Sequence, residues 1–80
     1  MRIPIIAGNW KMHTTIDEAA ALAREMLAGL QAVRGVERVL CPPFVSLSAV
    51  SEVLRGADVG LGAQDLFWEE EGAYTGEISP

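Results

Sequence analysis

Residues 3–12 read IPIIAGNWKM, and this stretch decides the fold of the chain. Its first five residues are mostly apolar without alternation, as expected of a strand buried on both faces. Because successive strand residues point to opposite faces, Asn9 and Lys11 are predicted to share one face while Trp10 takes the other. The pattern therefore places an amide and a cation together at the carboxyl end of a strand, where α/β folds bind ligands. A lysine close to a helix start suits an anion.

Strands and helices are predicted to alternate along the chain. We expect three strands, at about residues 1–7, 37–41 and 58–63. We expect two helices between them, one beginning near Thr15 and one over about residues 46–55. Thr15 and Glu18 have the spacing of a capping box, and Gly35 and Gly56 are predicted to end the two helices. The order βαβαβ predicts an α/β fold with a parallel sheet.

The final residues indicate a continuation of the same pattern. Ser79-Pro80 is typical of a helix start, with a capping residue followed by proline at the first helical position. Three parallel strands leave two open sheet edges. We therefore expect the chain to be the beginning of a longer α/β protein.

Residues 64–76 show no period and are predicted to form a long loop. The loop carries Phe67, Trp68 and Tyr74, which a loop of this kind cannot bury by itself. Exposed aromatic side chains are typical of a partner surface.

The composition excludes several classes of partner. The net charge is −5, which argues against nucleic acid and against an anionic membrane surface as partners. No apolar run approaches the roughly 18 residues of a membrane span, and no signal peptide is visible. Cys41 is the one cysteine, so no internal disulfide is possible and a reducing compartment is expected. The sequence thus predicts a cytoplasmic protein that can still bind a small phosphorylated metabolite through locally placed cations.

Lys11 is the strongest candidate for chemistry, weighed against a solvated lysine at a strand end. Asn9 is a candidate beside it, weighed against the alternative that its amide only stabilises a turn. His13 is expected to be a surface residue, and Cys41 an inert packing residue within an apolar run. Histidine and cysteine spacings predict no metal site, and the glutamates at 69–71 are expected to be solvated.

Four stretches, taken together and in order, resemble the triosephosphate isomerase family. They are AGNWKMH at 7–13, LCPPF at 40–44, GAQD at 62–65 and GAYTGEISP at 72–80. The resemblance implies a (β/α)8 barrel of about 250 residues with its site at the carboxyl ends of the strands. Residues 1–80 would be the amino-terminal part of that single domain, with its first three strands, two helices and the loop 64–76. It further implies a cofactor-free glycolytic and gluconeogenic enzyme that interconverts dihydroxyacetone phosphate and D-glyceraldehyde 3-phosphate through an enediolate.

The resemblance also implies residue roles. Lys11 would be catalytic and substrate-binding, and Asn9 would be substrate-binding beside it. A homodimer is implied through the loop 64–76, with interface residues Met12, Thr75, Gly76 and Glu77. The family's glutamate base, histidine electrophile and closing loop would lie beyond residue 80, and His13 does not match that histidine. The 80 residues alone are therefore expected to be inactive.

Two other interpretations remain open. The chain could be a non-catalytic βαβαβ fragment or interaction module whose aromatic loop binds a partner. A flavodoxin-like domain would need two more strands and a phosphate loop that this sequence lacks.

Overall fold

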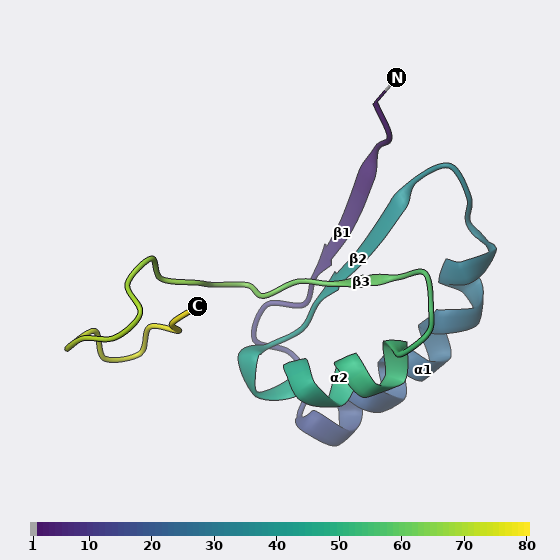
Figure 1. Ribbon diagram of the computed structural model, residues 1–80. Coiled ribbons are helices and arrows are strands. Elements are labelled where there is room, and N and C mark those ends of the chain that lie inside the picture. Colours follow the sequence, from purple (N-terminus) through teal and green to yellow (C-terminus); the bar gives the residue numbers. More distant parts are fainter. Residues whose placement is uncertain (1) are drawn as a thin grey trace.

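The computed structural model describes residues 2–80, which form a three-stranded sheet and two α-helices (Figure 1). In chain order the elements are β1 (Ile5–Asn9), α1 (Ile16–Ala32), β2 (Glu37–Cys41), the 3-10 turn η1 (Phe44–Ser46), α2 (Leu47–Leu54) and β3 (Gly60–Leu61). This is the predicted βαβαβ order.

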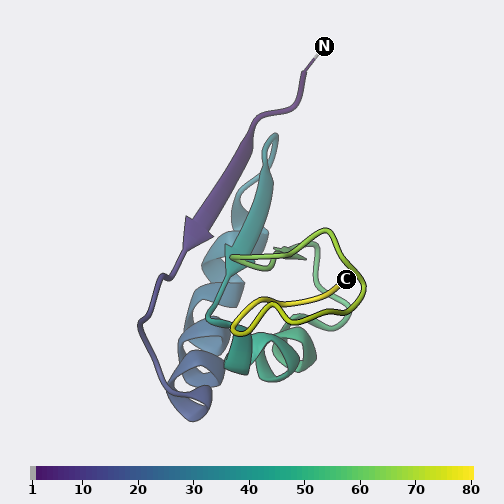
Figure 2. The same cartoon turned by 90° about the vertical axis from the view of Figure 1, so that its left-hand side faces the viewer.

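The sheet is parallel, with β2 between β1 and β3. Ile5 pairs with Glu37 and Asn9 with Cys41, so β1 and β2 are aligned along their whole length. Both helices lie on the same face of the sheet and pack against each other (Figure 2). Right-handed crossovers between neighbouring parallel strands produce this arrangement. The turns after the strands consequently gather at one edge of the sheet.

The buried core lies between this helical layer and β2. Its six buried apolar side chains are Ala19, Ala23, Leu40, Val50, Leu54 and Val59. Trp10 packs against the cluster, as do Met26, Leu27 and Leu30 of α1. The small alanines at 19 and 23 let α1 approach α2 closely, which favours a compact helical layer.

All three predicted strands are present, but only one has the predicted first and last residues. β2 has the predicted bounds, whereas β1 extends to Asn9, two residues further than predicted, because Asn9 continues the ladder with Cys41. The predicted start of that strand at Met1 lies outside the described residues, and the prediction is wrong for residues 2–4, because β1 begins at Ile5. β3 is limited to Gly60–Leu61 because a ladder with β2 forms only opposite Val39 and Leu40.

The prediction that β1 is buried on both faces is wrong for this chain. Ile3, Ile5 and Ile6 are each more than 60% exposed. The buried cluster that α1 and α2 form with the sheet includes Leu40 of β2 and, among the described residues, none of β1. Within residues 2–80, no packing partner buries these apolar side chains.

The two helices confirm the capping prediction and correct one helix end. Thr15 is the N-cap of α1, and its hydroxyl and the Glu18 carboxylate make both hydrogen bonds of the capping box. Gly56 follows α2 with φ +78°, as predicted for a terminal glycine. α1 ends at Ala32, however, because Val33 is extended and its N–H closes the last turn on the Leu30 carbonyl.

Gly35 therefore does not end the helix and lies in the following loop with φ +83°. Neither helix in residues 2–80 is long and apolar enough to cross a membrane. Ser79 and Pro80 are not helical, since two residues cannot close a hydrogen-bonded helical turn.

The loop 64–76 has no regular structure, as predicted, and extends away from the sheet (Figure 1). Phe67 holds it together: its N–H donates to the Ile78 carbonyl at 2.7 Å, and its ring lies 4.4 Å from the Tyr74 ring. The third aromatic ring, Trp68, is 82% exposed. The aromatic residues thus partly cover one another and leave Trp68 outward.

Candidate functional site at the carboxyl ends of the strands

The turn after β1 is hydrogen-bonded to the ends of the neighbouring strands. The Trp10 N–H donates to the Cys41 carbonyl at 3.1 Å, one residue beyond the sheet ladder. The Gly62 N–H donates to the Leu40 carbonyl at 2.9 Å, extending β3 in the same way. The ends of all three strands are thereby held together at one edge, where the sequence places its candidate site.

Asn9 and Lys11 meet in a way that strand alternation did not predict. The Asn9 side-chain oxygen Oδ1 accepts a hydrogen bond from the Lys11 backbone N–H at 2.9 Å. Lys11 has φ +54°, so the extended backbone stops after Asn9 and the predicted shared face does not continue. Asparagine often bonds the backbone two residues on and so forms a turn. The contact between the two residues is therefore a hydrogen bond from the Lys11 backbone to the Asn9 side chain, and the two side chains need not share a face.

Two residues in this short turn have a left-handed backbone. Besides Lys11, Thr14 has φ +81°, and its Oγ1 is buried without a hydrogen-bond partner among the described residues. A left-handed conformation costs an L-residue other than glycine roughly 1–2 kcal/mol. Strain of this kind persists only where the surroundings hold it, and it is concentrated at functional sites. The turn is therefore a candidate site on geometric grounds as well.

Gln64 is the residue that sequence reasoning missed. Its side-chain nitrogen Nε2 donates to the Lys11 carbonyl at 3.0 Å and to the Cys41 carbonyl at 2.8 Å. It is 53 residues from Lys11 in the sequence. Two signals were available: its place just after β3, at the same edge of the sheet as Lys11, and its position in the family-like stretch GAQD at 62–65.

The tip of the turn is open to solvent. Lys11, Met12 and His13 are all exposed, which confirms the prediction of a surface histidine. Within residues 2–80, neither ion pair involves Lys11, so its ammonium is free to bind an anion. Cys41 is half-buried, and an added Cβ at Gly62 would lie only 2.9 Å from its Sγ, consistent with a packing residue.

The predicted interface residues of the long loop lie in a second, separate turn. Tyr74 to Glu77 form this turn, closed by the Glu77 N–H on the Tyr74 carbonyl at 3.0 Å, with Gly76 at φ +88°. The neighbouring Asp65 raises the pKa of Glu77, first through a side-chain hydrogen bond and then by charge repulsion. No described hydrogen bond joins this turn to Lys11.

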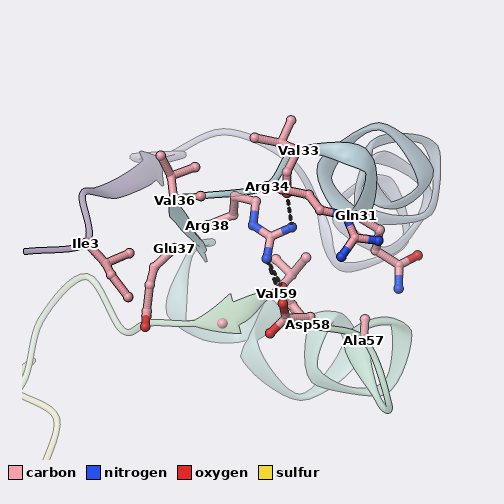
Figure 3. A pocket seen from close by; sticks show the side chains of 12 residues that line it. Ile3, Gln31, Val33, Arg34, Val36, Glu37, Arg38, Ala57, Asp58 and Val59 are labelled. Carbon is pink, nitrogen blue, oxygen red and sulfur yellow. Dashed lines mark hydrogen bonds and ion pairs between the residues drawn. The ribbon is translucent and has the colours of Figure 1, made fainter.

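A pocket of about 570 Å³ lies at the opposite edge of the sheet, among the turns that precede β2 and β3 (Figure 3). Arg38 projects into this region, where its guanidinium donates to the carbonyls of Leu30, Val33 and Asp58 at 2.7–2.8 Å. The same group bonds the Asp58 carboxylate at 2.9 Å. In (β/α)8 barrels the residues at the amino-terminal edge of the strands usually serve stability, and active sites lie at the carboxyl edge. The pocket is therefore not the candidate site.

The chain matches known proteins over nearly its whole length. The sequence model described as Triosephosphate isomerase matches residues 4–80. Curated triosephosphate isomerases of Dehalococcoides mccartyi strain 195 and Thermoanaerobacter pseudethanolicus are 55% and 56% identical over all 80 residues. The chain spans 32% of the length of each of these relatives.

A solved structure gives the same result. The crystal structure of triosephosphate isomerase from Bartonella henselae superimposes on 96% of the chain with a TM-score of 0.84 and 38% sequence identity. The chain corresponds to 31% of that structure. Sequence and fold agree that this chain belongs to the triosephosphate isomerase family.

Proposed function

We propose that this chain is the amino-terminal third of an enzyme that interconverts dihydroxyacetone phosphate and D-glyceraldehyde 3-phosphate. The observation that carries the proposal is the strained turn at Lys11, which presents a free ammonium at the carboxyl edge of the sheet of a family member. Residues 1–80 would form part of a single (β/α)8 barrel in the cytoplasm. The reaction moves a proton between adjacent carbons with no net oxidation or reduction, so it requires no redox cofactor.

Lys11 supplies charge to this reaction. Its ammonium binds the anionic substrate and offsets negative charge as the enediolate forms. Two unit charges about 4 Å apart interact by roughly 4 kcal/mol at an effective dielectric constant near 20. Asn9 fixes the Lys11 peptide through its Oδ1 and is the second substrate-binding residue.

The same proposal assigns the long loop to a homodimer. Thr75, Gly76 and Glu77 form the exposed turn that would enter a second subunit near its Met12, which is 94% exposed in this chain. Trp68, at 82% exposed, would gain cover in the same contact. The acid–base groups of the reaction would lie in the remaining part of the barrel.

The test uses the completed barrel, meaning this chain followed by the rest of the barrel, which the 56%-identical Thermoanaerobacter relative can supply. Lys11→Met should lower kcat/KM for glyceraldehyde 3-phosphate by about 10³-fold, the equivalent of 4 kcal/mol. Arg24→Met removes an exposed cation on α1 and should leave activity unchanged. Near-normal turnover by Lys11→Met would refute the role of Lys11.

Residues 1–80 alone should show no turnover in a coupled assay, since they lack the acid–base groups. A completed barrel with no isomerase activity would favour the alternative of a non-catalytic interaction module.

A further inference from the structure

We infer that Gln64 is a positioning residue for Lys11: its side-chain amide fixes the backbone from which the ammonium projects. This inference rests on the proposed function, because it assigns a purpose to the Lys11 geometry. It concerns a residue that lies 53 positions away in the sequence and donates a hydrogen bond to the backbone carbonyl of Lys11.

The Lys11 residue is held on both sides. Asn9 Oδ1 accepts from its N–H at 2.9 Å, and Gln64 Nε2 donates to its carbonyl at 3.0 Å. Asn9 belongs to the same turn, whereas Gln64 comes from the end of a different strand. Gln64 is therefore the contact that ties the conformation of Lys11 to the rest of the sheet.

The second hydrogen bond of Gln64 gives this contact a fixed reference point. Nε2 also donates to the Cys41 carbonyl at 2.8 Å, and that carbonyl already accepts from the Trp10 N–H at 3.1 Å. Cys41 is the last residue of β2, the central strand. One amide thus joins the turn after β1, the end of β2 and the residue after β3.

Backbone strain explains why such a support is needed. Lys11 has φ +54°, a conformation that lysine seldom adopts unaided. If the carbonyl were released, the residue would relax toward negative φ, and its side chain would leave the backbone in another direction. Because the lysine side chain is long, a small backbone rotation displaces the ammonium substantially.

The amide chemistry distinguishes positioning from direct substrate binding. A glutamine amide has two N–H donors, and both face carbonyl oxygens here. The group left over is the oxygen Oε1, which accepts hydrogen bonds and does not attract a phosphate. Gln64 therefore acts on an anionic substrate through Lys11.

The first test replaces Gln64 by methionine in the completed barrel. Gln64→Met keeps an unbranched side chain of similar length and removes both donors. Misplacing a catalytic group by about 1 Å can cost 100-fold, so kcat/KM should fall about 10- to 100-fold. Gln31→Met, at an exposed glutamine near the end of α1, is the matched control and should be unchanged. Unchanged activity of Gln64→Met, with the wild type active, would overturn the inference while the proposed function stands.

The second test asks whether the effect passes through Lys11. The probe is glycerol 3-phosphate, which carries the phosphate but has no carbonyl to react, with its Kd measured by calorimetry. Gln64→Met should weaken binding when Lys11 is present and have no further effect in a Lys11→Met background. Equal weakening in both backgrounds would indicate a general structural role and refute the inference.

The third test keeps the inference falsifiable should Gln64→Met not fold. Gln64→Glu has the same shape, but an ionised carboxylate repels the two carbonyls, whereas a protonated carboxyl restores one donor. The activity of Gln64→Glu relative to wild type should therefore rise at least several-fold as pH falls through the pKa of the introduced carboxyl. A ratio that is constant with pH would overturn the inference. A wild-type barrel without activity would instead refute the proposed function, and the inference with it.

Discussion

Arg38 and Asp58 form an ion pair of 2.9 Å whose two members lie in opposite environments (Figure 3). The Arg38 side chain is 10% exposed, and the Asp58 side chain is 96% exposed. Arg38 is also bonded to three backbone carbonyls, two of which belong to the end of α1 and the loop after it. The arginine therefore acts mainly as a bridge between loops, and the carboxylate is its least essential partner.

This asymmetry predicts unequal costs for the two partners. Arg38→Met removes the guanidinium donor from the Val33 carbonyl and one of the two donors from the Leu30 carbonyl, which keeps the Val33 N–H, and should lower the free energy of unfolding by about 1–3 kcal/mol. Asp58→Asn removes only a solvent-screened charge and should cost less than about 1 kcal/mol. Urea unfolding of the completed barrel measures both, with Arg24→Met as the control. Equal costs would mean that the ion pair, not the backbone contacts, stabilises the loops.

Asn9 offers a prediction about binding. Asn9→Ala removes the acceptor for the Lys11 N–H, a hydrogen bond worth about 1 kcal/mol, so glycerol 3-phosphate should bind about 5- to 10-fold more weakly. Asn9→Asp keeps the acceptor and should keep the melting temperature, yet its negative charge beside Lys11 should also weaken binding. That second loss should shrink at high salt, since screening reduces it. Tight binding by Asn9→Asp at low salt would contradict an anion site at this turn.

The capping box predicts a pH dependence of stability. Hydrogen bonds from the Thr15 backbone N–H and then its hydroxyl group lower the pKa of Glu18. A lowered pKa means that the folded state favours the ionised form, so this stabilisation is present above the ordinary pKa and is lost as pH falls through the lowered value. Glu18→Gln should therefore reduce the difference in urea midpoint between pH 7 and pH 3. Thr15→Ala, which removes the cap, should cost about 1 kcal/mol at pH 7.

Glu77 predicts a pH dependence of stability with the opposite sign to that of Glu18. Asp65 raises its pKa, so the stabilisation by the protonated form is present below the ordinary pKa and is lost as pH rises through the raised value. Asp65→Asn removes the repulsion and leaves an amide that can donate to the ionised carboxylate. The pKa of Glu77, followed by carbon NMR of its carboxyl in the completed barrel, should fall in this variant. An unchanged titration would show that Asp65 is not its cause.

Local sequence signals predicted the elements whose determinants are neighbours in the chain. The capping box at Thr15 depends on contacts three residues apart, and β2 has the predicted bounds because Pro42 directly follows its apolar run. Family resemblance, carried by four stretches, correctly gave the membership that the comparisons show.

The features that sequence reasoning missed depend on residues distant in the chain. Arg38 meets Asp58 across 20 residues, and Gln64 meets Lys11 across 53. The left-handed backbone of Lys11 could not be predicted from its residue type, because lysine has no preference for that conformation. Strand alternation predicted a shared face for Asn9 and Lys11. The strand ends at Asn9, however, and the turn that follows it ends the alternation before Lys11.

The Arg38 bridge and the Lys11 turn lie at opposite ends of the same small sheet. No described hydrogen bond is shared by the turn and the bridge, so substitutions at one end are expected to leave the other end in place. In evolutionary terms the two ends of the sheet can change independently, because they share no described hydrogen bond. A lineage could therefore alter the edge that carries Lys11 one residue at a time and retain the Arg38 contacts at each step.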